Sequence, residues 1–365
     1  MNTPRVTAIV DTYNHEQFIE RAIESVLEQD FPADQMEVIV VDDGSTDSTP
    51  ARIAKYGERV CYLRKENGGQ ASAFNFAIPH AHGEIIAFCD GDDWWAKEKL
   101  SVLMEVFDRH PEAGIIGHGY FHVEQPQAPY PVVGPDREYT LELRKREGAE
   151  RYRQIKAFLG ASKVAIRREL FAKILPIPEE LVIEADEYMF TLAVALTEAR
   201  VLPRPLFYYR FHENNLFQIQ VHDETKTRRK GRVLDALVQT LPPALERAGV
   251  SREAVEIVME PLRVDATHIR LHLDGGWPWE TFGVERALLR LGYQNPSLGY
   301  RAFKAGVLGL SLVLPPRAFY KLKQWYSRSG ASELRRVMGE GVAVAPVVTT
   351  NPLKLETGNW KIEDR

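Results

Sequence analysis

The hydrophobic positions in the first hundred residues follow two alternating spacings. Short runs made almost entirely of apolar residues predict four buried strands, at Val6 to Val10, Glu37 to Val41, Val60 to Leu63 and Glu84 to Cys89. Apolar residues at helical spacing between these runs predict three helices, at Phe18 to Leu27, after the capping segment Asp47 to Pro50, and at Gln70 to His80. Strands that alternate with helices are typical of parallel sheets. The sequence therefore predicts an α/β, Rossmann-like fold with ligands at the carboxyl ends of the strands.

Beyond residue 100 the pattern changes twice. Residues 126–148 are rich in proline and then in charge, which favours a long functional loop, and regular structure is expected again near Arg151. We then expect helices at Arg167 to Leu175 and Ile183 to Thr197, and a short aromatic strand at Pro205 to Phe211. After Asn215 the signal is helical, at Thr225 to Arg247, Arg252 to Leu273 and Trp279 to Leu291. We therefore predict a mostly parallel α/β domain over residues 1–220, a helical region over 221–338 and an irregular tail over 339–365.

Composition narrows the classes of protein that this chain can be. Its 365 residues carry a net charge of −5, so a basic face for nucleic acid is not expected. Cys61 and Cys89 lie in apolar runs and match neither a disulfide framework nor a zinc site, which favours reduced thiols and a cytoplasmic location. The sequence shows no leader and no run of the ~18 apolar residues that a spanning helix needs. We expect a cytoplasmic protein that is soluble or peripheral at the inner face of the membrane.

Acid and amide side chains gather where three of the four predicted strands end. They are Asp11 with Asn14, Asp42 with Asp43, and Asp90 with Asp92 and Asp93. Parallel strands bring these ends to one crevice, where so many carboxylates repel one another unless a cation or a ligand satisfies them. Mg²⁺ or Mn²⁺ prefers carboxylate oxygens, and usually takes one or two of them together with substrate phosphates. We therefore expect a divalent metal at Asp90-Gly91-Asp92, the alternative being a solvated turn.

Three segments in order carry a resemblance to a known family. They are TAIVDTYNHEQFIERAIESVLEQDFPADQMEVIVVDDGSTDSTP, NGGQASAFNFAI and GEIIAFCDGDDWW. Together they are similar to the start of the family-2 inverting glycosyltransferases of the GT-A fold. The resemblance implies a hexosyltransferase that moves a sugar from a nucleoside-diphosphate sugar, with UDP the expected nucleotide, to a saccharide or lipid-linked acceptor in glycan or polysaccharide synthesis. It also implies Mg²⁺ or Mn²⁺ on the diphosphate, bound at the DXD motif.

The resemblance also assigns roles to residues. It implies that the base and ribose are held by Tyr13, Asp42 and Asp43, and that the nucleotide lies beside Asn67, Gly69 and Gln70. In the aspartate motif it implies a direct metal ligand at Asp92, with Asp90 and Gly91 near the ribose or the metal. Asp11 stands where the family usually has proline, and an extra carboxylate beside the base would alter donor choice. For Asp42 and Asp43, capping of the following turn and helix is an alternative that is compatible with binding.

The match is looser further along the chain. The family carries a Glu-Asp pair at a helix start that faces the donor sugar, and here IEADEYMF places Ala185 and Asp186 at those two positions. The resemblance implies that Asp186 is the general base for the acceptor hydroxyl, with Glu184 and Glu187 as rivals and a capping or first-turn acid of the following helix as the structural alternative. In YYRFHENN it implies that His212 contacts the metal or the diphosphate, and the alternative is a histidine within an aromatic cluster.

The stretch 301–336 combines charge with apolar character. It carries eight Lys or Arg residues against one acid, and it contains the apolar run Ala305 to Leu314. This combination is typical of a peripheral membrane surface, and a lipid-linked acceptor would require one. The alternative is a helix buried against the catalytic domain, with solvated basic flanks.

Two rival functions fit part of the sequence. A non-catalytic protein that binds carbohydrate or nucleotide sugar on a decayed transferase fold would explain Asp11 and Ala185, but the retained Asp42, Asp92 and Asp186 oppose it. A sugar-nucleotide pyrophosphorylase resembles a family with a Gly-rich basic loop after the first strand, and DTYNHEQF does not match that loop.

Overall fold

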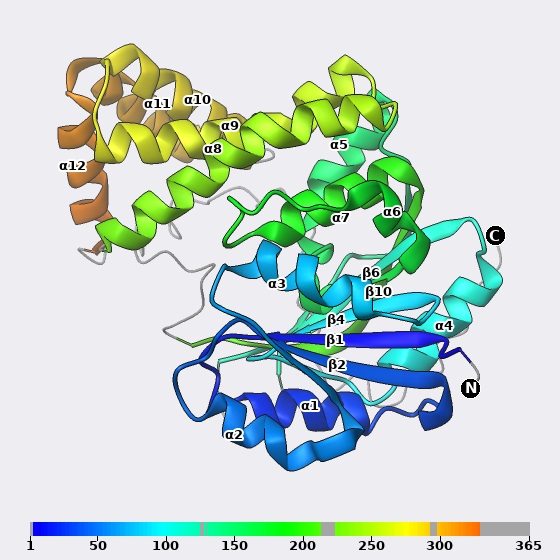
Figure 1. The fold of residues 1–365 in the computed structure, drawn as a ribbon. Helices are drawn as coiled ribbons and strands as arrows, with labels where there is room; N and C mark the ends of the chain where they lie inside the picture. Colours follow the sequence, from blue (N-terminus) through cyan, green and yellow to red (C-terminus); the bar gives the residue numbers. More distant parts are fainter. Residues whose placement is uncertain (1–2, 125–127, 129, 213–222, 293–297, 329–365) are drawn as a thin grey trace.

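The computed structural model describes residues 3–124, 128, 130–212, 223–292 and 298–328. One mixed sheet runs through the α/β part, with helices on both faces, and a further group of helices stands to one side (Figure 1). Within these residues the strands are β1 Val6–Thr12, β2 Met36–Asp42, β3 Cys61–Arg64, β4 Ile85–Asp90, β5 Trp94–Trp95, β6 Ala113–Val123, β7 Val132–Val133, β8 Tyr139–Leu141, β9 Val164–Arg167 and β10 Glu198–Arg210.

The first four strands form the parallel block that the sequence predicts, in the order β3-β2-β1-β4. Their ends lie within two residues of the predicted ends. The central strands are apolar on both faces, because helices cover both. One face is covered by α1 Ile19–Leu27, α2 Thr49–Ile53 and α4 Lys99–Arg109. The other face is covered by α3 Gln70–Ala77, α5 Arg146–Ile155, α6 Phe171–Ile174 and α7 Ala185–Leu196.

The second half of the sheet mixes directions, and two predicted elements begin at other residues there. β9 runs antiparallel to both β4 and β6, while β10 runs parallel to β6. Arg167 ends strand β9, so the helix expected from residue 167 begins one residue later, as a short turn of 3-10 helix at Arg168–Leu170 that continues into α6. The aromatic strand expected from residue 205 is confirmed as the end of the longer β10. Pro203 and Pro205 lower the strand signal of β10. The structure accommodates Pro205 where the pairing of β10 with β6 shifts its register.

The proline-rich segment contains more regular structure than its sequence indicates. In the described part of residues 126–148, β7 pairs with β6 and β8 pairs with β10. Helix α5 begins at Arg146, earlier than the expected Arg151.

The helical region follows the sequence prediction closely. Its helices are α8 Glu224–Arg247, α9 Arg252–Leu273, α10 Pro278–Gly292, α11 Leu298–Val313 and α12 Pro316–Arg328. The first two begin at true N-caps, since Asp223 accepts from the Lys226 N–H at 3.0 Å and Ser251 from the Ala254 N–H at 3.3 Å. Both share the large apolar core around α7, so the boundary near residue 220 stays a prediction about sequence organisation.

The last three helices pack with the end of α9 around a further, small core. It consists of Leu271 from α9, Val284 from α10, and Phe319 and Tyr320 from α12. The predicted tail, 339–365, and residues 329–336 lie outside the described residues. No helix in the described parts is both long and apolar enough to cross a membrane.

Candidate active site

The register of the parallel strands brings the predicted acids to one edge of the sheet. Asp11 of β1 lies opposite Asp90 of β4, and Thr12 lies opposite Asp42 of β2. Asp43 follows on the same edge, where its backbone N–H donates to the Thr12 carbonyl at 3.0 Å. The carboxyl edge of an open α/β sheet is the usual place for a ligand crevice.

Asp43 organises the loop that enters α3. Its carboxylate accepts a hydrogen bond from the Gly69 N–H at 2.7 Å and another from Asn67 Nδ2 at 3.1 Å, and it forms an ion pair with Lys65 at 2.9 Å. Gly69 has a φ of +87°, and a Cβ there would lie 2.5 Å from the Cα of Val182, so the loop requires glycine at this position. Asp43 thus holds together two residues, Asn67 and Gly69, that the sequence assigns to the nucleotide.

Asp42 has a different environment from Asp43. It is fully buried, and its two oxygens accept from the Ser45 N–H and the Tyr62 hydroxyl, each at 2.7 Å. Arg64 completes an ion pair with it at 3.6 Å. The geometry thus favours the capping alternative for Asp42, and its contact with the nucleoside stays a prediction. Tyr13 is 44% exposed and accessible to a ligand.

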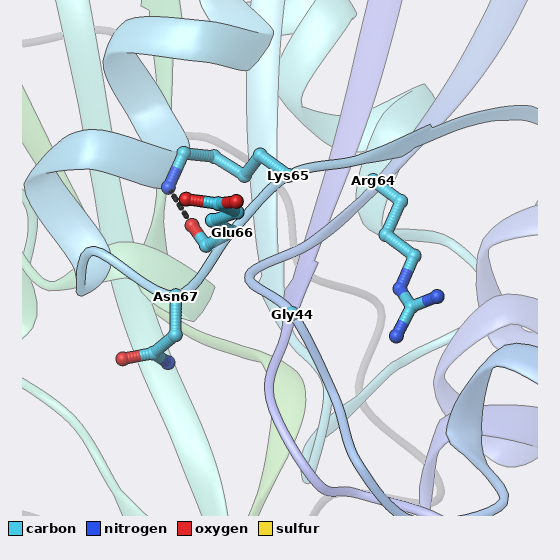
Figure 2. A pocket seen from close by; sticks show the side chains of 5 residues that line it. All are labelled: Gly44, Arg64, Lys65, Glu66 and Asn67. Carbon is cyan, nitrogen blue, oxygen red and sulfur yellow. Dashed lines mark hydrogen bonds between the residues drawn. The ribbon is translucent and has the colours of Figure 1, made fainter.

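A cleft of about 470 Å³ opens beside this loop, beyond the ends of β2 and β3. Figure 2 shows Gly44 at its centre, with Arg64 on one side and the Lys65-Glu66-Asn67 segment on the other. The volume is typical of small-molecule sites, and the two basic side chains suit an anionic ligand.

The aspartate motif meets the end of β10. Oδ2 of Asp92 lies 3.0 Å from Nε2 of His212, and the His212 ring packs on Phe18 with centroids 4.9 Å apart. Burial alone would raise the pKa of Asp92, but the hydrogen bond with His212 and the charge of His15 hold that pKa below its usual value. His212 thus lies at the motif, as predicted for a residue near the metal, and also in an aromatic cluster.

The other acids of the cluster are pushed towards their neutral forms. Burial, and next the charge of Asp90, raises the pKa of Asp11 well above its usual value. Burial, and next the charge of Asp92, raises the pKa of Asp90 to about 6 and that of Asp93 well above its usual value. Oδ1 of Asp11 is buried without a hydrogen-bond partner among the described residues. A bound cation would relieve this mutual repulsion.

These donors fit a metal that is shared with a ligand. No group of three or more His, Cys, Asp or Glu side chains in the described part of the chain is arranged to hold an ion by itself. Mg²⁺ is commonly bound through one or two carboxylates plus substrate phosphates, so a small donor set suits it. Asp92, with His212 beside it and Asp90 nearby, provides such a set.

Gln70 connects the nucleotide loop to the helix that carries Asp186. Its Oε1 accepts from the Ala185 N–H at 3.0 Å, which fixes the start of α7 against α3. Burial, and next the charge of Asp90, raises the pKa of Asp186 to about 7. Oδ1 of Asp186 accepts from the N–H of Glu187, only one residue along, whereas an N-cap accepts from two or three residues along. The geometry disfavours a cap, but Asp186 does lie in the first turn of α7, as the first-turn alternative expects.

The two rival acids are already paired with lysines. Glu184 lies 3.1 Å from Lys230 of α8, and Glu187 lies 2.7 Å from Lys156. Asp186 forms no such pair within the residues that the structure describes, although the charge of Lys163 acts on it. Of the three acids, Asp186 is therefore the one whose carboxylate is most available to accept a proton.

Three residues at the site were not selected from the sequence. Ser162 donates to Asp90 Oδ2 at 3.1 Å and accepts from the Asp90 N–H, while Lys163 on the same turn faces Asp90 and Asp186. His15 lies against the motif, because a Cβ on Gly91 would be 2.7 Å from its Nδ1. His15 lies in DTYNHEQF, within the first segment that carries the family resemblance. Its position four residues after Asp11 is the signal in the sequence that could have identified it.

Comparisons with known proteins agree with this geometry. Residues 7–175 match the family model described as Glycosyl transferase family 2. An uncharacterized glycosyltransferase of Nostoc is 30% identical over 226 residues, which cover 58% of this chain and 66% of that protein. TarS of Staphylococcus aureus, a poly(ribitol-phosphate) beta-N-acetylglucosaminyltransferase, is 32% identical over 218 residues, 56% of this chain and 35% of TarS. The matches thus span about one third to two thirds of these relatives' lengths.

A solved structure shares the fold. Residues 1–349 of Staphylococcus aureus TarS, in complex with UDP-GlcNAc, superpose with a TM-score of 0.56 at 22% identity, over 79% of this chain and 82% of that one. The parallel block, the acids at its carboxyl edge and the family match agree with one another. Residues 7–175 are therefore a glycosyl transferase family 2 domain, and the chain has the GT-A fold.

Proposed function

We propose that this protein is a metal-dependent, inverting glycosyltransferase of the hexosyltransferase type. The observation that carries the proposal is the environment of Asp186, whose pKa is raised to about 7 by burial and by Asp90, while its rivals Glu184 and Glu187 are held in ion pairs. A carboxylate that titrates near neutral pH beside a phosphate-binding motif is suited to general base catalysis.

The donor in this proposal is a nucleoside-diphosphate sugar, with UDP as the first nucleotide to test. The relative TarS is an N-acetylglucosaminyltransferase, and its structure was solved with UDP-GlcNAc. In this chain Tyr13, the Asp43 loop and the cleft of about 470 Å³ would receive the nucleoside. Gln70 would keep that nucleotide segment in register with Asp186.

The transfer would take place in one displacement. Asp186 would take the proton from the acceptor hydroxyl as that oxygen forms a bond to the anomeric carbon, and the bond from that carbon to the diphosphate oxygen breaks. A single displacement inverts the anomeric centre and needs no covalent intermediate. The charge of Lys163 favours the ionised form of Asp186, which is the form that accepts the proton.

Asp92 would hold a divalent ion together with the donor diphosphate, with His212 and Asp90 beside it. When bound, Mg²⁺ or Mn²⁺ would supply positive charge against the diphosphate as it leaves. The hydrogen bond to His212 would keep Asp92 ionised and oriented for this role. Asp11, which lies opposite Asp90, would change the electrostatic potential at the same site.

We also propose that the acceptor is a saccharide or lipid-linked saccharide in glycan or polysaccharide synthesis. The protein would then act in the cytoplasm, with peripheral contact to the inner face of the membrane through residues 301–336. The basic and apolar character of this stretch supports the proposal.

The test is a screen of UDP-, GDP- and dTDP-sugars for binding and hydrolysis with Mn²⁺, with Mg²⁺ and with EDTA. We expect one nucleotide class to bind and to be hydrolysed only with metal, and NMR of the first-formed sugar to show the inverted anomer. Donor binding without any turnover would favour the non-catalytic alternative. A first-formed product that keeps the donor's anomeric configuration would rule out the single displacement.

A further inference from the structure

Helix α11 presents an apolar face to solvent. The exposed positions between residues 302 and 313 are two alanines, two glycines, two leucines and one valine, with no charged side chain among them. Leu310, Leu312 and Val313 are 39%, 48% and 76% exposed. A surface helix of a soluble protein normally turns charged and polar residues toward solvent, and this face has none of them. The alternative in which the run 305–314 is buried against the catalytic domain is therefore wrong for its exposed positions.

Three exposed tryptophans belong to the same part of the molecule. Trp277 lies in the loop 274–277 that joins α9 to α10, called here the tryptophan loop, and Trp279 lies in the first turn of α10. They are 62% and 60% exposed, and their rings stack with centroids 4.8 Å apart. Trp325 on α12 is 64% exposed. Tryptophan is the side chain most suited to a membrane interface, because its ring is apolar and its indole N–H remains hydrated.

Packing holds these elements at one end of the helical region. The guanidinium of Arg317, at the start of α12, donates to the carbonyl of Leu273 at 2.7 Å, just before the tryptophan loop. The same loop rests on Leu271, because a Cβ on Gly276 would be 2.5 Å from its side chain. Leu271 and Leu314, which follows α11, pack in one small core. The exposed apolar residues thus lie around a common core.

Charge is segregated onto the same helices. Residues 298–328 contain six Lys or Arg and no acid, although the whole chain has a net charge of −5. On α12, the exposed positions include Arg317 and Lys321 next to Leu322 and Trp325, so basic and apolar side chains share one face. A soluble protein partner would not require basic and apolar side chains on the same face. An anionic lipid surface attracts both kinds of side chain.

We propose that these residues form a membrane-docking face that binds anionic lipid. The face consists of Trp277, Trp279, Leu310, Val313 and Trp325, with Arg317 and Lys321 at the headgroup level. It extends the contact at 301–336 to the α9–α10 loop, which the sequence did not indicate. Lipid binding by this face does not depend on the proposed function. Its consequence does, namely that the acceptor which reaches Asp186 is linked to lipid.

The docking face is connected to the active site through α8. Lys230 of α8 pairs with Glu184, the residue that precedes α7, at 3.1 Å, and Arg228 pairs with Asp274 of the tryptophan loop at 3.1 Å. Two residues apart on a helix point to nearly opposite sides, so α8 itself lies between the two contacts. Figure 1 shows α12 on the side toward which β1 runs from the N-terminus. Helix α8 thus links the docking face to the residue that precedes α7.

The test is flotation of the full chain with vesicles of phosphatidylcholine alone or mixed with phosphatidylglycerol. We expect binding to the anionic vesicles only, weakened by high salt. Trp277→Ser combined with Trp279→Ser, and separately Lys321→Glu, should each lower the partition coefficient by about tenfold or more. The tryptophan loop should keep its shape, because the Trp277 N–H donates to Glu280 and does not depend on the rings.

Matched changes outside the face provide the controls. Phe76→Ser on α3, 37% exposed, and Lys173→Glu on α6 should leave vesicle binding unchanged. Equal binding to neutral and anionic vesicles, or no loss in the tryptophan variant, would overturn the proposal. So would tryptophan variants that change only the oligomeric state measured by light scattering, which would indicate a second copy as the occupant. Donor hydrolysis should be unchanged in every face variant, and its absence from the wild type would count against the proposed function alone.

Discussion

His212 and Asp92 are joined by a 3.0 Å contact between Nε2 and Oδ2, although 120 positions of the chain separate them. Two more bonds accompany this contact, since Arg210 donates through its backbone N–H to Asp93 Oδ1 at 3.0 Å and through Nε to the Asp92 carbonyl at 2.9 Å. The end of β10 is thus fastened to the aspartate motif at three points. A change at Asp92 therefore affects both the expected metal site and the anchoring of the residues at the end of β10.

We predict that Asp92→Asn removes the metal dependence of donor binding while the fold persists. Asparagine keeps the size of the side chain and an oxygen near His212, but it lacks the charge that an ion such as Mn²⁺ requires. Calorimetric titration of UDP with Mn²⁺ and with EDTA measures this directly, and turnover should be lost as well.

Asp34→Asn, an exposed acid of the same domain, is the matched control and should bind UDP like the wild type. If Asp92→Asn keeps a Mn²⁺-dependent increase in UDP affinity, the ion is held elsewhere.

A second prediction separates nucleoside binding from support of the loop. Tyr13→Ala should weaken donor affinity by roughly tenfold or more without lowering the melting temperature, because an exposed aromatic ring contributes about 1–3 kcal/mol when a base stacks on it. Asp42→Ala should do the opposite. It leaves Tyr62 and the Ser45 N–H unpaired in a buried place, which costs about 1–3 kcal/mol for such a group. Thermal melting and UDP titration of both variants test this prediction. The same change in melting temperature and in UDP affinity for the two variants would contradict it.

A third prediction concerns the pH dependence of stability. The pKa of Asp11 is raised well above its unfolded value by burial and by Asp90, so its protonated form favours folding. That contribution is complete below about pH 4, the usual range of an aspartate, and it is lost as pH rises through the folded pKa. Asp11→Asn should therefore melt like the wild type at pH 4 and at a higher temperature at pH 8, measured without metal. A variant that loses stability with pH as steeply as the wild type would show that Asp11 is not the strained acid.

The parallel strands of the first 90 residues could be predicted because each one is marked by its own short stretch of sequence. The strands from Val6 to Asp90 are apolar runs bounded by turn residues, and their carboxyl ends hold the acids. The first part of β10 was missed because Pro203 and Pro205 oppose a strand, and pairing with neighbouring strands, β6 above all, compensates.

The completed site depends on contacts between distant segments. Ser162 reaches Asp90 across 72 residues, and Gln70 reaches Ala185 across 115. No periodicity connects such pairs, so the sequence indicated which residues carry chemistry but not what holds them. The pairing of Glu184 with Lys230 and of Glu187 with Lys156, which distinguishes the three acids near residue 186, is likewise visible only in the fold.

A fourth prediction follows from the titration of Asp186. Burial, followed by the charges of Asp90 and Glu187, raises its pKa to about 7, so the ionised base should become available as pH rises through neutrality. Transfer at saturating metal should therefore rise along a limb with an apparent pKa at or below about 7, since a bound cation beside Asp90 lowers the value. A rate that stays flat between pH 5 and about 8 would argue against a base of this kind.

The last prediction concerns Asp186 itself, where a base and a structural acid give opposite results. Asp186→Asn should reduce turnover by roughly 10²–10⁴-fold, the usual contribution of a general base, while donor affinity stays near that of the wild type. Stability should not fall, because the buried carboxylate is repelled by Asp90 and forms no ion pair among the described residues.

The controls are the flanking acids. Glu184→Gln and Glu187→Gln each break an ion pair, with Lys230 and Lys156, so they should lower the melting temperature and largely spare turnover. Because both pairs are partly buried, breaking one leaves a lysine without its partner, and that cost belongs to folding and not to the chemical step. Should one of these variants, and not Asp186→Asn, abolish transfer while donor binding persists, the proton acceptor is that glutamate, and its lysine would then be the group that tunes it.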